Sequence, residues 1–117
     1  MTAGKQRFYL LIPDLAEARG KSDMLSFTGT TADSFAAQLQ AALREPSLWQ
    51  RWKSMQPDPD AIDPALGAND PQAGVVARQS DLHTDVQVTT MLPYTLLKHR
   101  LCLLIGAHWT LRDVGNA

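Results

Sequence analysis

The chain has 117 residues, of which 44% are hydrophobic and 20% are charged, and its formal net charge is −1. This length and composition suit one folded domain over residues 1–117 and argue against overall disorder, while the balanced charge disfavours a dedicated nucleic-acid binder. The single cysteine, Cys102, excludes an internal disulfide, and the apolar runs are too short for a secretory signal or a membrane span. We therefore expect a cytoplasmic protein.

The first predicted element is a strand over residues 7–12, which are rich in aromatic and branched side chains and are followed by Pro13. Apolar residues on both faces favour a central position in a sheet. A polar connection over residues 14–30 follows, and connections of this length often carry function. Within this connection, residues 24–27 predict a short extra strand.

Two helical segments are predicted next. Thr31 is a suitable N-cap, and apolar residues recur at helical spacing until Pro46, which interrupts the first helix and can open the second. The apolar stripes comprise Phe35, Leu39, Ala42 and Leu43 in the first helix, and Leu48, Trp49, Trp52 and Met55 in the second. Residues 56–74 are rich in Pro and Asp and contain no basic residue, which predicts an acidic loop.

The second half of the chain predicts two strands, a helix and a last strand. Residues 75–79 and 84–91 form a hairpin with a turn near Asp81, the helix covers Tyr94–Ile105, and residues 108–114 form the last strand. The full order is strand, helix, strand, strand, helix, strand. This order predicts an α+β fold, a ferredoxin-like split βαβ sandwich with the helices on one face of an antiparallel sheet.

The closing helix has an apolar stripe and a basic face. The stripe comprises Leu97, Leu101, Leu104 and Ile105. Lys98, His99 and Arg100 are expected to face solvent. Cys102 is expected to be buried, because a free cysteine usually behaves as a small hydrophobe.

A polar cluster is predicted on the hairpin. Asp81, His83 and Asp85 alternate along the chain, and residues spaced by two lie on the same face of a strand. A histidine between two carboxylates can act as a base or help to hold a metal. An ordinary turn with surface residues is the favoured interpretation, because no nucleophile or third ligand lies nearby in the sequence.

No metal site and no cofactor are predicted. His99, Cys102 and His108 lack the close pairing typical of zinc ligands. The acidic residues of the 56–74 loop do not follow the spacing of a calcium-binding loop, so we expect them to be solvated. These residues are Asp58, Asp60, Asp63 and Asp70. The glycine fingerprints of nucleotide-binding loops and the serine elbow of hydrolases are missing, and no catalytic motif is identified.

An aromatic and basic stretch on the second helix is a candidate nucleic-acid interface. Trp49 and Trp52 could stack on bases, and Arg51 and Lys53 could hold phosphates. The two tryptophans lie three residues apart on the apolar stripe, however, which is typical of packing against a core. Core packing is the favoured interpretation.

The sheet face opposite the helices is the strongest functional candidate. The residues expected on this face are Tyr9, Leu11, Asp85, Gln87 and Thr89. Mixed apolar and polar surfaces of this kind often form interfaces with a second copy or with another protein. We therefore expect a non-enzymatic binding or protein-interaction module, with a homodimer as one form. The alternative is a small-molecule-binding or catalytic domain that uses the 14–30 loop and His83.

Overall fold

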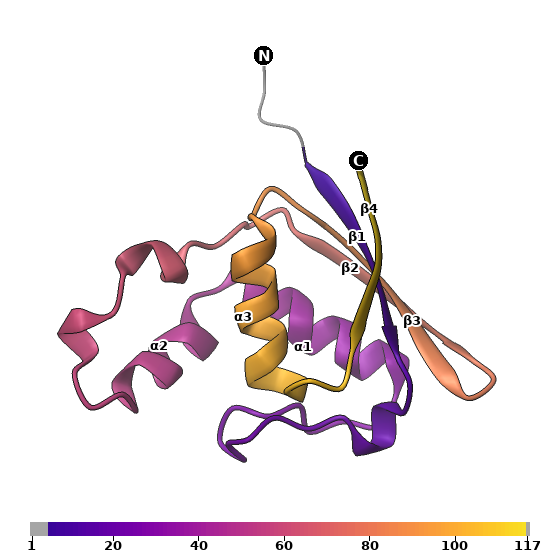
Figure 1. Ribbon diagram of the computed structural model, residues 1–117, viewed down its shortest axis with the longest axis horizontal. Helices are drawn as coiled ribbons and strands as arrows, with labels where there is room; N and C mark the ends of the chain where they lie inside the picture. The colour runs from indigo at the N-terminus through magenta and orange to yellow at the C-terminus, as the bar shows by residue number, and fades with distance from the viewer. Residues whose placement is uncertain (1–4, 117) are drawn as a thin grey trace.

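Four strands form one antiparallel sheet in the computed structural model, which describes residues 5–116 (Figure 1). The strands are β1 (Gln6–Ile12), β2 (Gly74–Ser80), β3 (His83–Thr90) and β4 (Thr110–Asn116), and the α-helices are α1 (Ala32–Arg44), α2 (Ser47–Ser54) and α3 (Tyr94–Ile105). Short 3-10 helices lie at Leu15–Glu17, Pro59–Ala61 and Pro64–Gly67. The strand order is β2-β3-β1-β4, and neighbouring strands are antiparallel. The predicted α+β class is confirmed.

One face of the sheet carries the core. Along the two central strands, β1 and β3, buried and partly exposed residues alternate, because successive side chains of a strand point to opposite faces. The buried apolar side chains are Phe8, Leu10, Ile12, Val86 and Val88. Helices α1 and α3 lie against this face (Figure 1), and their buried stripes join the strands in one apolar cluster.

The helices begin and end close to where the sequence predicts. The Thr31 hydroxyl accepts a hydrogen bond from the Ser34 backbone N–H at 3.1 Å, and Ser34 Oγ accepts one from the Thr31 backbone N–H at 3.2 Å. This reciprocal capping box satisfies two N–H groups near the start of α1. Pro46 separates α1 from α2 and occupies the N-cap position of α2. No helix within residues 5–116 has the length and apolar character needed to cross a membrane.

The 14–30 connection contains no strand at residues 24–27, and that prediction is wrong. The segment forms turns, and the backbone N–H of Phe27 donates to the carbonyl of Leu104 at 2.8 Å. Leu104 lies in the last turn of α3, where the carbonyl groups have no partner inside the helix. The connection therefore pairs with a helix end instead of a strand, and it buries Leu25 and Phe27 in the core.

Arg100 is fully buried, which corrects the prediction that it faces solvent. Its Nη1 and Nη2 atoms donate to the carbonyls of Leu66 and Ala68 at 2.8 and 3.0 Å. Burial lowers the pKa of the guanidinium, but an arginine in a protein keeps its charge. A charged side chain of α3 thus holds the 56–74 segment through backbone carbonyls.

Asp70 is also buried, which corrects the prediction that the whole acidic run is solvated. Its Oδ2 accepts hydrogen bonds from Thr90 Oγ1 at 2.8 Å and from the Met91 backbone N–H at 2.9 Å, and its Oδ1 accepts one from the Gln72 N–H at 3.0 Å. Burial alone would raise the pKa of this carboxyl. The hydrogen bonds to its ionised form, together with the positive charge of Lys5, outweigh burial and hold the pKa below its usual value.

Candidate functional site

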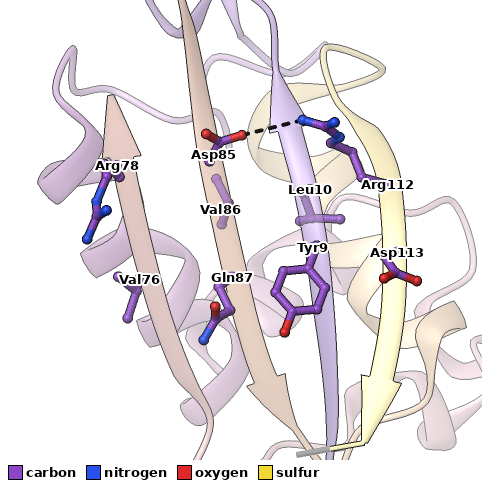
Figure 2. A pocket seen from close by; sticks show the side chains of 9 residues that line it. All are labelled: Tyr9, Leu10, Val76, Arg78, Asp85, Val86, Gln87, Arg112 and Asp113. Atoms are coloured by element: carbon purple, nitrogen blue, oxygen red, sulfur yellow. Dashed lines mark ion pairs between the residues drawn. The ribbon is translucent and has the colours of Figure 1, made fainter. Parts of the chain in front are cut away.

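The second face of the sheet is not covered by α1 or α3 (Figure 1), and residues from all four strands line a hollow of about 590 Å³ on it (Figure 2). Its polar and charged members are Tyr9, Arg78, Asp85, Gln87, Arg112 and Asp113. Val76 of β2 adds an apolar side chain that is 61% exposed. We call this surface the sheet hollow. It combines both charge signs with apolar and aromatic area.

A β-bulge turns Arg112 toward the sheet hollow. Strand β4 pairs with β1 as Tyr9↔Asp113 and Leu10↔Leu111, which leaves Arg112 as the extra residue in the register. In a regular strand, neighbouring side chains point to opposite faces, but a bulge redirects one of them. Arg112 and Asp113 both line the hollow in consequence (Figure 2).

Asp85 lies close to two other ionisable groups of this face, His83 and Arg112. Its Oδ2 lies 3.3 Å from His83 Nε2 on the same strand, and its Oδ1 lies 3.9 Å from Arg112 Nη1, which reaches across β1 from β4 (Figure 2). All three side chains are partly exposed, and exposed ion pairs contribute at most about 1 kcal/mol to stability. The contacts therefore do more to orient the side chains than to stabilise the fold.

The residues predicted for the open face lie together on it. Tyr9, Leu11, Asp85, Gln87 and Thr89 are all partly exposed and alternate with buried neighbours. Of the predicted polar cluster, the structure brings His83 and Asp85 into contact, while Asp81 lies in the hairpin turn with a φ of +47°. The sequence interpretation missed Val76, Arg78, Arg112 and Asp113. Alternation along β2 could have indicated Val76 and Arg78. No sequence signal marks the bulge in β4 that turns Arg112 toward this face.

A second hollow, of about 610 Å³, lies between the 14–30 loop, α2 and α3. We call it the α2–α3 groove, and its lining residues are Lys21, Ser22, Leu25, Trp52, Met55, Gln56, His99, Cys102, Leu103, Gly106 and Ala107. Most of this lining is apolar. The groove differs in this respect from the sheet hollow, in which charged side chains from three strands take part.

Two of the three residues considered as metal ligands line the α2–α3 groove. Cys102 is exposed, so the prediction that it is buried is wrong. The His99 ring packs edge-on against Trp52, with 4.4 Å between ring centroids, and burial lowers the pKa of His99. His108 is exposed and is not part of the groove. Within residues 5–116, no group of three or more metal-ligating side chains is found.

The aromatic stretch of α2 takes part in packing. Trp49 is buried, and the Lys53 ammonium lies over its ring, 5.2 Å from the centroid. Trp52 contacts the core and the ring of His99. This arrangement leaves Trp49 little surface on which a base could stack, as the core-packing interpretation expects.

Comparisons with protein-family models, with curated proteins and with solved structures found no match. A function therefore has to be inferred from the surface itself. The sheet hollow and the α2–α3 groove are the two features whose chemistry can support an inference.

Proposed function

We propose that this chain is a non-enzymatic interaction module that associates with a second copy of itself through the open face of its sheet. The observation that carries the proposal is the composition of the sheet hollow. Arg78 and Arg112 supply positive charge, Asp85 and Asp113 supply negative charge, and the exposed Val76 supplies apolar area. A face with all three properties can complement itself.

Self-complementarity follows from the geometry of a two-fold dimer. In such a dimer the same patch meets itself, so each group of one copy faces a different group of the other. A patch of one charge sign would repel its copy. A face that carries arginines and carboxylates from different strands can place opposite charges in register across the interface.

The size of the face predicts weak association. Four strands of about seven residues cover roughly 20 by 23 Å at the usual strand spacing and rise. This area is below the ~800 Å² per partner of a standard stable interface. We therefore expect a reversible monomer–dimer equilibrium rather than an obligate dimer.

The proposal also includes the finer fold assignment and the compartment. The observed order along the chain and the strand order β2-β3-β1-β4 support a ferredoxin-like split βαβ arrangement, in which one sheet face stays open. Helix α2 and the 56–74 segment are additions between α1 and β2. A free and exposed Cys102 supports a reducing compartment such as the cytoplasm.

The alternative function, a small-molecule or catalytic site built from the 14–30 loop and His83, has less support. Side chains of the loop line the α2–α3 groove together with α2 and α3. His83 instead contacts Asp85 on the sheet. The third candidate, nucleic-acid binding through α2, is weakened by the burial of Trp49.

The test is sedimentation equilibrium over micromolar to millimolar protein concentrations. We expect the apparent mass of the unmodified chain to rise toward twice the monomer mass and to fall back when salt is added. Val76→Glu should remain monomeric, because it replaces the exposed apolar side chain of this face with a carboxylate. Met24→Glu is the matched control, since Met24 is exposed on the 14–30 loop and should dimerise like the unmodified chain. A chain that stays monomeric at millimolar concentration, or a dimer that Val76→Glu leaves intact, would overturn the proposal.

A further inference from the structure

The α2–α3 groove is built on a loop that is firmly attached to α3. The hydroxyl of Ser26 accepts a hydrogen bond from the Gly20 N–H at 2.9 Å and donates to the Leu104 carbonyl at 3.2 Å. The Gly20 backbone approaches the Leu103 carbonyl so closely that a Cβ at this position would overlap it. One wall of the groove is therefore set before any ligand arrives, which lowers the cost of binding.

The interior of the groove is apolar. Leu25, Trp52, Met55 and Leu103 contribute apolar side chains, and Met55 remains 46% exposed in the free protein. His99 closes against Trp52, and its burial favours the neutral imidazole at pH 7. A volume of about 610 Å³ falls within the usual range of small-molecule sites. The surface suits an apolar chain.

The charge at the groove has one sign. Lys21 lies at the groove on the 14–30 loop and is exposed, and none of the described residues that line the groove is acidic. Ser22 and Gln56 add groups that can donate hydrogen bonds. The complement of an apolar interior with a cationic edge is a molecule with an apolar chain and one carboxylate.

We propose that the α2–α3 groove binds an amphipathic monocarboxylate of the fatty-acid class, with its chain against Trp52, Met55 and Leu103 and its carboxylate at Lys21. This site is separate from the sheet hollow, because the two hollows share no lining residue. The proposal therefore does not depend on self-association. Cys102 has no role in binding but provides a reporter, since it is the only cysteine of the chain and lines the groove.

The experiment follows the alkylation of Cys102 by iodoacetamide in the full chain while sodium decanoate is added below its micelle-forming concentration. A bound chain should cover the thiol, and the rate should fall about ten-fold when decanoate is present at ten times its Kd. Lys21→Glu should weaken decanoate binding by about ten-fold, because the charge contact is lost and the new carboxylate repels that of the ligand. Lys98→Glu is the matched control, because Lys98 is exposed on α3 and does not line the groove. Its affinity for decanoate should equal that of the unmodified chain.

Two further probes test the carboxylate contact and the apolar contact separately. 1-Decanol has the same chain without charge and should bind up to about five-fold more weakly than decanoate, because the contact of an exposed lysine is worth at most about 1 kcal/mol. Met55→Asp should abolish protection by placing a carboxylate against the ligand chain. Protection that does not saturate, or decanol protection equal to that by decanoate and unaffected by Lys21→Glu, would overturn the proposal.

Discussion

The two long connections of the chain are both fixed to α3, but by different interactions. Residues 14–30 contribute four apolar side chains to the core, which are Leu15, Ala18, Leu25 and Phe27. The 3-10 helices of residues 56–74 contain no buried residue, and this segment is held by hydrogen bonds to the buried Arg100 and by the buried Asp70. The first connection is therefore anchored mainly by buried apolar side chains. The second adds only Ala73 and the partly buried Leu66 to the core and is held largely by polar contacts, with Arg100 and Asp70 as its buried charged groups.

The difference predicts how each connection responds to damage. Apolar contacts are many and non-directional, so loss of one weakens the whole core. A buried charged group with two or three directed hydrogen bonds is a single attachment, and its loss releases a segment while the rest remains folded. Substitutions in the first connection should therefore lower global stability, and substitutions at the two charged residues should act locally.

The largest effect is expected from Phe27→Ala. Phe27 is buried, packs edge-on against Phe35 with 5.4 Å between centroids, and lies beneath the Arg19 guanidinium. Removing a buried phenylalanine costs about 4 kcal/mol from lost burial and the cavity left behind. Denaturant unfolding should show this loss as one cooperative transition at a lower midpoint. Met24→Ala on the exposed part of the same loop should change stability by less than about 0.5 kcal/mol. Equal effects of the two variants would mean that the connection is not part of the core.

Arg100→Leu is the second test and should act mainly on residues 56–74. Two charge-assisted hydrogen bonds to carbonyls are lost, and we expect a cost of about 3 kcal/mol. A protease of broad specificity should then cleave within this segment while the sheet stays protected. Lys98→Leu makes the same kind of change at an exposed position of α3 and should leave cleavage unchanged. If the protease degrades the Arg100→Leu variant throughout the chain without first cleaving within residues 56–74, the segment does not open independently of the rest of the fold.

Arg100 also indicates which sequence signals were informative. It lies three residues after Leu97 and four before Leu104, so helical spacing places it within the buried stripe of α3. Residue type, in contrast, predicted an exposed arginine. Cys102 is the opposite case, because its type predicted burial while it falls outside that stripe and is exposed. At both positions spacing was the better guide, since it reports the direction of a side chain whatever its chemistry.

The sheet and helices were predictable because their signals are local. Alternation of apolar and polar residues along β3 indicated its buried face, the apolar run of β1 indicated a central strand, and Thr31 identified the start of α1. The contacts that the sequence did not indicate are long-range. The carbonyls that receive Arg100 lie more than thirty residues away in the chain, and the bulge at Arg112 depends on the register of β4 against β1. No local pattern specifies either contact.

The smallest of the three effects is expected from Asp70→Asn. The amide keeps one oxygen acceptor but presents an NH₂ group where Oδ2 now accepts from Thr90 and the Met91 N–H. Two donors then face each other at Met91, and we expect a cost of about 2 kcal/mol at neutral pH. Hydrogen exchange should show loss of protection at the Met91 amide, while the amides of β1 keep theirs. Asp58→Asn, in the exposed part of the same segment, should change neither measurement.

The pH dependence of this variant tests the cause of the effect. Hydrogen bonds hold the folded-state pKa of Asp70 below its usual value, so its ionised form stabilises the fold at every pH above the unfolded-state pKa of about 3.9. As the pH falls through the folded-state pKa, the carboxylate is protonated in both states and this contribution disappears. The difference in unfolding free energy between the unmodified chain and Asp70→Asn should therefore be constant near neutrality and shrink in strong acid. A difference that stays constant into strong acid would mean that Asp70 acts through shape rather than charge.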